Sequence, residues 1–353
     1  MKVAFIGLMC ILLIGCASYS AVNDRRSAVV LTIEQVKLEL SELSFQVAPV
    51  PSRKATEYFK HYGLMPAGAV HFFGTFRSGA NQLVAHIYRP QVSQGSVILV
   101  HGYYDHAGIW KNLLSHLLSR HYTVAIFELP GHGLSGGDRV STRCFSEYRT
   151  AVRDFILLCQ KHLSGPFHIV AHSMGAGVTA DFFLSCETEA LDGKVVFLAP
   201  LIRPAYARIS RFGRAMVSPF FSSLPRWFRK NSSDETFLQF VKDDPLQERH
   251  LPLTFCRAMH TWYKNMPDRQ PTEQKVLIIQ GTSDTTVDWR YNLRFLKKKF
   301  PDAKSELVPG AGHQLTNESG TLRRMVFGLI DAYIYSSPNN LNHDAESEQP
   351  DPY

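Results

Sequence analysis

The stretch Ile169–Gly177, IVAHSMGAG, places an apolar run directly before a serine and small residues directly after it. A nucleophilic serine on a sharp strand-to-helix turn follows the pattern G-x-S-x-G, because the strained turn leaves no room for side chains two positions to either side. Here the five residues are Ala171–Gly175, with alanine, the next smallest residue, at the first position. A loop at the end of a buried strand would give the same residues, so the rest of the chain has to decide.

Short apolar runs alternate with helix-like segments on both sides of this stretch. They are Val97–Val100, Val124–Phe127, Ile169–Ala171, Val195–Leu198, Val276–Ile279 and, more weakly, Glu306–Val308. Such runs suit strands that are covered on both faces, and helices between them suit βαβ crossovers. In one intervening segment, apolar residues recur every three or four positions from Phe145 to Leu163, as on one face of a helix. The pattern predicts a doubly wound α/β sheet.

Two segments precede this alternation. In an N-terminal extension over residues 16–65, apolar side chains recur from Val29 to Leu43 at the spacing of an amphipathic helix. The runs HFFGTF and LVAHIY then flank the polar link Arg77–Asn81, which predicts an antiparallel hairpin.

A long interval without a clear strand separates Val195–Leu198 from Val276–Ile279. An irregular loop of this length is uncommon in a compact domain. We therefore predict a helical cap over residues 201–270, inserted into a core formed by residues 66–200 and 271–335.

Two further residues fall where partners of the serine belong. A serine hydroxyl needs a base, and an imidazole base needs a carboxylate to fix its tautomer. On a strand–turn–helix scaffold these partners follow in the order serine, acid, histidine, each after a strand. Asp284 follows the run Val276–Ile279, and His313 follows Glu306–Val308. We predict that Ser173, Asp284 and His313 form a catalytic triad.

Each of the three residues also has another explanation. Asp284 could cap a helix, and Asp288 is its nearest rival as the acid. His313 is one of fifteen histidines, and most histidines are structural or lie on the surface. The order of the three residues and their places at strand ends favour the triad.

An oxyanion hole on this scaffold needs two backbone N–H groups, one directly after the serine and one after an earlier strand. These requirements point to the amides of Met174 and Tyr103. His101 and Gly102 would then shape the turn before Tyr103. His101 is a rival for the catalytic base, but the chain order places the base later.

These motifs together resemble the α/β-hydrolase superfamily. They are His101-Gly102, GHGLSGG at 131–137, HSMGA at 172–176, Asp284 and GAGH at 310–313. Within the superfamily, residues 70–334 are similar to the monoacylglycerol lipase and lysophospholipase group of serine hydrolases. The resemblance implies a mostly parallel eight-stranded sheet flanked by helices, an inserted helical cap, and ester hydrolysis through an acyl-enzyme. No metal or organic cofactor is needed for that chemistry.

The resemblance also implies that Gly131-His132-Gly133 and Ser135 form a structural turn near the site. Two departures from the pattern stand out. Ala171 replaces the usual glycine, and HGYYDHAG at 101–108 differs from the glycine-and-glutamate loop typical of monoacylglycerol lipases. The second departure leaves the identity of the substrate open.

The chain begins MKVAFIGLMCILLIGCAS, with one lysine before an apolar run that is too short to cross a bilayer as a helix. Residues 1–15 are typical of a secretory signal peptide, and an uncleaved anchor is the alternative. Leu13-Ile14-Gly15-Cys16 resembles the bacterial lipoprotein processing box, which implies lipid attachment at Cys16 and stable anchoring. The absence of aspartate directly after Cys16 favours the periplasmic face of the outer membrane within the cell envelope.

Charge is unevenly distributed over a chain with a net charge of +7. Between Leu201 and Lys230 there are seven Lys or Arg and no acidic residue, interleaved with aromatic residues such as Trp227 and Phe228. This composition fits contact with a lipid surface, and it fits equally an aromatic core under a solvated basic face. No nucleic-acid-binding motif accompanies the charge. Residues 336–353 form an acidic tail that we expect to be disordered.

Cysteine spacing argues against a metal site. Cys144, Cys159, Cys186 and Cys256 are widely separated and contain no CxxC pair. Disulfides would be permitted outside the cytosol, but the sequence cannot pair them. Cys159 and Cys186 fall in helix-like segments and are expected to be buried thiols.

The sequence thus predicts a serine hydrolase that cleaves carboxylic esters of lipids, either lysophospholipid or monoacylglycerol. Short-chain carboxylesterase, proline-type peptidase and acyltransferase are alternatives on the same fold, and a non-catalytic envelope binding protein is an alternative of another class. Serine at position 173 argues against dehalogenases and epoxide hydrolases, which attack through a carboxylate. Acyl length, headgroup and oligomeric state stay open.

Overall fold

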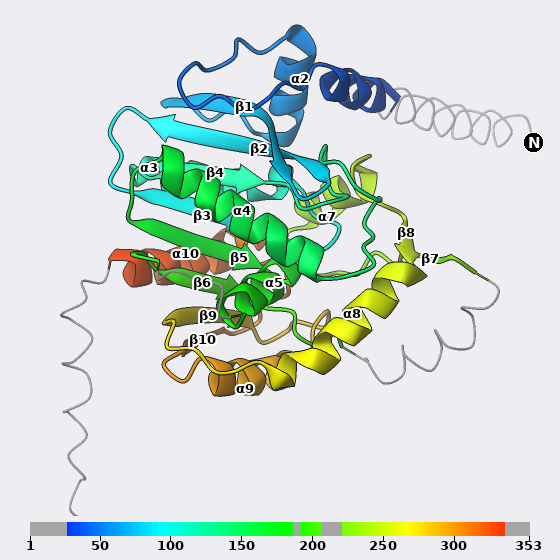
Figure 1. Cartoon of the computed structure of the whole chain (residues 1–353), viewed down its shortest axis with the longest axis vertical. Coiled ribbons are helices and arrows are strands. Elements are labelled where there is room, and N and C mark those ends of the chain that lie inside the picture. Colours follow the sequence, from blue (N-terminus) through cyan, green and yellow to red (C-terminus); the bar gives the residue numbers. More distant parts are fainter. Residues whose placement is uncertain (1–26, 186–190, 206–220, 336–353) are drawn as a thin grey trace, which may run out of the picture.

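A computed structural model of the chain describes residues 27–185, 191–205 and 221–335. At its centre lies an eight-stranded sheet in the order β1-β2-β4-β3-β5-β6-β9-β10 (Figure 1). The strands are β1 (Ala69–Ser78), β2 (Asn81–Pro90), β3 (Ser96–Val100), β4 (Thr123–Phe127), β5 (Phe167–His172), β6 (Val195–Leu198), β9 (Val276–Gly281) and β10 (Lys304–Val308). Strand β2 is antiparallel to both of its neighbours, and every other pair is parallel. The predicted α/β-hydrolase architecture is confirmed.

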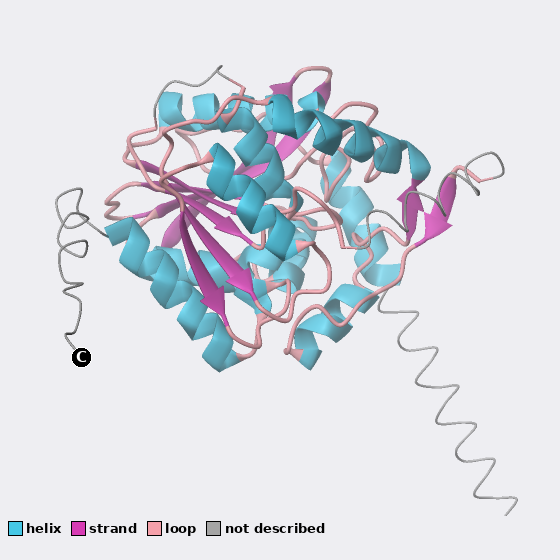
Figure 2. Ribbon diagram, turned by 90° about the horizontal axis from the view of Figure 1, so that it is seen from below, coloured by secondary structure: helices cyan, strands magenta, loops and turns pink. Residues whose placement is uncertain are grey.

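Helices cover both faces of this sheet (Figure 2). One face packs against α4 (Ser146–His162), α5 (Met174–Phe183) and α9 (Trp289–Lys299). The other packs against α2 (Arg53–Tyr62), α3 (Lys111–Ser119) and α10 (Gly320–Tyr335). Every residue of β3, β4, β5, β6 and β9 is buried, which explains why these strands read as continuous apolar runs.

The hairpin is as the sequence predicts, but the predicted helix of the N-terminal extension ends at Leu38, before Leu40 and Leu43. Residues 27–38 form a helix that buries Ile33 and Val36 in the apolar core on the face of the sheet covered by α2, α3 and α10. Strands β1 and β2 pair from Ala69 with Pro90 to Ser78 with Asn81. The extension therefore packs onto the sheet.

The segment between β6 and β9 holds helices and a short strand pair. Helices α7 (Glu235–Asp243) and α8 (Leu253–Asn265) lie in it, and β7 (Ser223–Pro225) pairs antiparallel with β8 (His250–Pro252). Three-residue strands are too short to show periodicity in the sequence. Within the described ranges, no helix is both long and apolar enough to cross a bilayer.

Several predictions concern residues that are not described. Cys16, Cys186, residues 206–220 of the basic aromatic stretch, and residues 336–353 all lie outside the described ranges.

Candidate active site

Ser173 occupies a strained turn between β5 and α5. Its φ of 53° lies in the left-handed region, which costs free energy for any residue other than glycine. Two backbone hydrogen bonds hold the turn: the Ser173 N–H donates to the Leu198 carbonyl at 2.9 Å, and the Leu201 N–H donates to the Ser173 carbonyl at 2.9 Å. The strand-to-helix turn predicted from IVAHSMGAG is therefore present.

Small residues around Ser173 are required by close backbone approach. A Cβ atom on Gly175 would lie 2.4 Å from the His101 carbonyl oxygen and 2.5 Å from that of Val100. Ala171 is buried and pairs with Val100 of β3 and Phe197 of β6. The turn thus forms with alanine in place of the usual glycine.

The structure brings Ser173, Asp284 and His313 together. The Nε2 atom of His313 lies 2.9 Å from the Ser173 Oγ, and its Nδ1 atom lies 2.7 Å from the Asp284 Oδ2. Asp284 follows β9 and His313 follows β10, so the parallel sheet delivers both to the edge that carries Ser173. All three side chains are at least nine-tenths buried.

The surroundings of Asp284 keep this carboxylate ionised. Its Oδ1 accepts from the backbone amides of Thr286 and Val287 at 2.7 and 3.2 Å, and its Oδ2 accepts from the Gln280 side-chain Nε2 at 3.1 Å. Burial raises the pKa of Asp284, but the charge and hydrogen bond of His313, with those of its other donors, outweigh burial and lower it. Burial lowers the pKa of His313, and the charge and hydrogen bond of Asp284 more than compensate, so the net shift is upward. The pair thus favours an imidazole that accepts a proton.

Asp288 and His101, the alternative candidates for the catalytic acid and base, form other contacts. Asp288 accepts from the Tyr291 amide at 3.3 Å as the N-cap of α9, and it pairs with Arg203. His101 accepts at Nε2 from the Leu129 amide at 2.9 Å and donates from Nδ1 to the Gly102 carbonyl at 2.8 Å. Burial lowers the pKa of His101 to about 4, so this ring is neutral and structural.

Tyr103 and Met174 both flank the serine. Met174 is the first residue of α5, so its N–H has no acceptor within the helix. The backbone before Tyr103 passes so close that a Cβ on Gly102 would lie 3.0 Å from the Ser173 Cβ. Their amides stay our proposed oxyanion donors.

A second buried acid beside the serine was missed by the sequence analysis. The Asp105 Oδ2 lies 3.3 Å from the Nδ1 of His172, and the Nε2 of His172 donates to the His313 carbonyl at 3.1 Å. Gln314 also donates to Asp105 at 3.4 Å. Burial raises the pKa of Asp105, but the hydrogen bond and charge of His172 bring it down to about 2. Asp105 lies within HGYYDHAG, but nothing in that motif predicts which side chain Asp105 contacts.

A residue of the inserted segment fixes the loop that carries His313. The Asn231 carbonyl accepts from the amides of both His313 and Gln314 at 2.9 Å. A Cβ on Gly312 would lie 2.8 Å from the same oxygen. The insertion therefore orients the base as well as covering the serine, which sequence spacing gave no reason to expect.

A cavity of about 540 Å³ opens onto Ser173 and His313, within the range that holds small ligands. Most of its wall is apolar and comes from the inserted segment. These wall residues are Leu201, Pro204, Leu224, Pro225, Trp227, Phe237, Val241, Leu251, Phe255 and Met259. Asp105 is the only acidic side chain among the described residues that line the cavity.

Two described arginines of the insertion, Arg226 and Arg229, contact residues of the core, whereas Lys230 is exposed and pairs with Glu235. The Arg226 guanidinium lies 3.9 Å from the centre of the Tyr104 ring, and it donates to the Gln247 Oε1 at 2.7 Å. Arg229 donates to the Thr285 carbonyl at 3.1 Å. Trp227, in contrast, is 86% exposed.

The turn at 131–135 is structural, as the resemblance implies. Gly131 and Gly133 have φ angles of 74° and 53°, and a Cβ on Gly133 would overlap the Glu128 carboxylate. The Ser135 hydroxyl accepts from the Val84 amide at 2.8 Å and donates to the Glu128 carbonyl at 2.6 Å. Of the described cysteines, Cys144, Cys159 and Cys256 are free thiols. The predicted burial of Cys159 in a helix is confirmed.

A family model described as serine aminopeptidase, S33, matches residues 91–320, about two thirds of the chain. This chain belongs to that family. Membership and the environment of Ser173 together make it a serine hydrolase.

Known relatives cover most of the chain at low identity. A monoacylglycerol lipase of Mycolicibacterium smegmatis is 24% identical over 268 residues, which is 73% of this chain and 94% of that protein. A probable lysophospholipase L2 of Haemophilus influenzae is 22% identical over 285 residues, 70% of this chain and 87% of its own length. A soluble variant of monoglyceride lipase from Saccharomyces cerevisiae, solved with a substrate analog, superposes with a TM-score of 0.63 at 18% identity. That alignment covers 74% of this chain and 94% of the yeast chain.

Proposed function

We propose that the protein hydrolyses carboxylic esters of single-chain lipids, monoacylglycerol or lysophospholipid, through an acyl-enzyme on Ser173. The observation that carries the proposal is the 2.9 Å contact between the Ser173 hydroxyl and His313 at the floor of a largely apolar cavity. An acyl chain can lie against such walls while its carbonyl reaches the hydroxyl. The names of the relatives support the same substrate class.

The mechanism follows from the order of contacts. The Nε2 of His313 takes the proton from the Ser173 Oγ as that oxygen attacks the ester carbonyl, and the proposed amide donors of Tyr103 and Met174 stabilise the oxyanion. His313 then protonates the departing alcohol as the ester C–O bond breaks. A water molecule, deprotonated by His313, attacks the acyl-enzyme and releases the fatty acid and Ser173. Throughout, Asp284 holds the imidazole in the tautomer that presents a lone pair to Ser173.

The family description raises aminopeptidase activity as a second candidate. An aminopeptidase has to bind the positively charged α-amino group of its substrate, which favours a free carboxylate in the cavity. Asp105 is the only described acid there, and its oxygens already meet His172 and Gln314. This arrangement favours esters over peptides.

The test is a substrate panel run on the wild type and on Ser173→Ala. We expect hydrolysis of monoacylglycerol and lysophospholipid to exceed that of a short aryl ester and of an aminoacyl anilide. A fluorophosphonate probe should label the wild type and leave Ser173→Ala unlabelled, while kcat falls by a factor on the order of 10⁵ to 10⁶. Faster cleavage of the anilide would replace the lipid assignment with the peptidase one. Unchanged ester hydrolysis by Ser173→Ala would refute the nucleophile itself.

We also propose that residues 1–15 are a signal peptide and that lipid on Cys16 anchors the protein to the periplasmic face of the outer membrane. The support is the motif Leu13–Cys16 and the charge-poor run before it. Labelled palmitate should enter the wild type in a Gram-negative host and not Cys16→Ser, with fractionation placing the wild type in the outer membrane. Equal labelling of the two proteins would contradict the proposal.

A further inference from the structure

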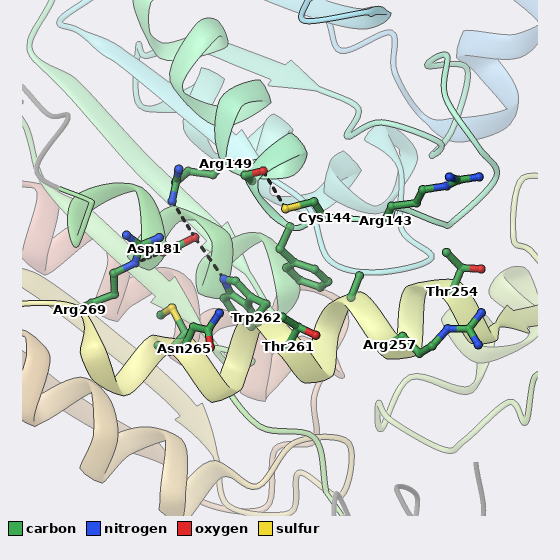
Figure 3. Close-up of a pocket in the computed structure, with 14 residues that line it drawn as sticks. Arg143, Cys144, Arg149, Asp181, Thr254, Arg257, Thr261, Trp262, Asn265 and Arg269 are labelled. Carbon is green, nitrogen blue, oxygen red and sulfur yellow. Dashed lines mark hydrogen bonds and ion pairs between the residues drawn. The ribbon is translucent and has the colours of Figure 1, made fainter. Parts of the chain in front are cut away.

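Helix α8 borders two separate cavities. Phe255 and Met259 line the cavity that holds Ser173. Arg257 and Trp262, on another side of the helix, line a second cavity of about 480 Å³ that lies between α8, the start of α4, and α5 (Figure 3). Ser173 and His313 are not among the residues that line this second cavity.

The second cavity, called the basic cavity below, carries a marked excess of positive charge. Its ionised side chains are Arg143, Arg149, Arg257, Arg269 and Asp181. Buried Asp181 accepts from the Arg269 Nε at 3.0 Å and lies 3.5 Å from Arg149, so it is already engaged by both.

The other two arginines are available for a ligand. Arg143 and Arg257 are exposed, and neither side chain forms a hydrogen bond or an ion pair with any described residue. Figure 3 shows them at the end of the cavity away from Asp181. A guanidinium is a fork of donors that matches the oxygens of a phosphate or carboxylate.

The floor of the basic cavity is apolar and aromatic. The rings of Phe145 and Trp262 stack with their centres 4.7 Å apart at an angle of 18°, and both side chains are buried. Trp262 is fixed in turn, since its indole N–H donates to Asp181 at 3.2 Å. Cations beside such a floor fit an anion that carries an apolar body better than a bare anion.

We propose that the basic cavity binds the phosphate headgroup of an anionic lipid, with Arg143 and Arg257 on the phosphate and the glycerol and acyl start against Phe145 and Trp262. Free phosphate would meet the same arginines but would gain nothing from the floor. This site goes beyond the proposed hydrolysis, because a headgroup held there lies outside the cavity of Ser173 and is not cleaved.

Ring contacts connect the basic cavity to the catalytic one. Phe145 lies 5.6 Å from Phe255, and Phe255 stacks on Tyr103 with ring centres 3.8 Å apart. A lipid seated on Phe145 would therefore steady the helix that packs against the proposed oxyanion loop. The basic cavity would give the enzyme a way to hold its cap on an anionic membrane.

The test uses the full chain with Ser173→Ala, so that no probe is hydrolysed. Dihexanoyl phosphatidic acid below its micelle concentration is titrated into three proteins by calorimetry: the Ser173→Ala parent, Arg143→Gln/Arg257→Gln, and the matched control Arg77→Gln/Arg294→Gln. The control removes two exposed arginines, from β1 and α9, whose side chains also form no hydrogen bond or ion pair with a described residue. The control and Arg143→Gln/Arg257→Gln therefore have the same net charge. Inorganic phosphate and dihexanoyl phosphatidylcholine are titrated into the parent.

We expect the dissociation constant for phosphatidic acid to rise at least about tenfold in Arg143→Gln/Arg257→Gln and to change little in the control. Phosphatidylcholine and inorganic phosphate should bind the parent more weakly than phosphatidic acid. Equal losses in both double variants would mean that only overall charge matters, and no loss in either would place the lipid elsewhere. Inorganic phosphate binding as tightly as the lipid would make the basic cavity a site for free anions. Each of these three results overturns the proposal, whatever the outcome of the substrate panel.

Discussion

Two buried histidine–aspartate pairs in this protein have similar distances but use opposite ring nitrogens, Nδ1 in His313 and Nε2 in His106, and have different surroundings. His313 and Asp284 are joined at 2.7 Å, and His106 and Asp244 are joined at 2.8 Å. The second nitrogen of His313 faces the Ser173 hydroxyl at the floor of a cavity. The second nitrogen of His106 accepts from the Gly108 amide at 3.1 Å, and the His106 side chain is fully buried.

The second pair serves to join segments. Asp244 follows α7 and also accepts from the Tyr62 hydroxyl at 2.7 Å, while His106 lies in the loop after β3. Three distant parts of the chain thus meet at one carboxylate: the N-terminal extension, the loop that carries Tyr103, and the inserted segment. In both pairs the pKa of the aspartate is lowered and that of the histidine is raised. The difference lies in what the other ring nitrogen faces: the Ser173 hydroxyl in the first pair, and the Gly108 amide in the second.

The largest expected effect comes from neutralising the acid of the first pair. Asp284→Asn keeps the shape but removes the charge that fixes the His313 tautomer, and we expect kcat to fall on the order of 10⁴-fold. Stopped or continuous ester assays on the folded variant measure this. Asp288→Asn, which loses its ion pair with Arg203 but can keep the helix cap through its amide oxygen, should keep kcat near the wild-type value. A similar loss in both variants would contradict the assignment of the acid.

The same substitution in the second pair should act on stability. Asp244→Asn leaves His106 without its charged partner and weakens the Tyr62 hydrogen bond, so the free energy of unfolding should fall by about 3 kcal/mol with little change in kcat. Denaturant titration measures it, with the exposed neighbour Asp243→Asn as the control. If Asp244→Asn instead destroyed activity without lowering stability, the contrast between the two pairs would be wrong.

The second pair should also have a pH window. Burial raises the pKa of Asp244, but His106 and the other hydrogen-bond donors outweigh burial and lower it. The stability that Asp244 contributes is therefore present at pH values above its pKa in the unfolded chain and is lost at lower pH. Burial lowers the pKa of His106, but Asp244 outweighs burial and raises it. The stability that His106 contributes is therefore present at pH values below its pKa in the unfolded chain and is lost as the pH rises. The stability difference between wild type and Asp244→Asn should thus be greatest between about pH 4 and 6.5.

The first pair should set the acid limb of the rate profile. Catalysis needs His313 unprotonated, and its pKa is raised by Asp284. In the wild type, kcat/KM should therefore fall with decreasing pH around a midpoint above about 6.5, the ordinary histidine value. In Asp284→Asn the residual activity should have its midpoint at lower pH, because the neighbouring negative charge is gone. A midpoint that does not move would mean that another group controls the limb.

The smallest effect is expected at Asp105. Its charge also raises the pKa of His313, and it reaches the His313 backbone through His172. Asp105→Asn should move the acid limb to lower pH by less than Asp284→Asn does, and it should lower kcat by about tenfold or less. Comparing the pH profiles of the two variants shows whether Asp105 only positions His313 or takes part in proton transfer as Asp284 does. A loss at Asp105 as large as that at Asp284 would make the two acids equal partners.

Much of the fold and the centre of the site could be predicted from the sequence because their signals are local. Buried strands appear as apolar runs, as at Val97–Val100 and Val276–Ile279. The turn at Ser173 requires small neighbours, since Gly175 has no room for a Cβ. Parallel strands bring their carboxyl ends to one edge, so Asp284 and His313 could be placed near Ser173 from order alone.

Other features were decided only by the tertiary structure, because their partners lie far apart and share no spacing or periodicity. His106 and Asp244 are 138 positions apart, and Asp105 and His172 are 67 apart. The carbonyl of Asn231 orients the loop of His313 through its backbone, whatever its side chain. Arg143 and Arg257 face one cavity only because the loop before α4 and helix α8 both border it. The sequence thus determined which residue could be the nucleophile, and long-range packing decided what surrounds it.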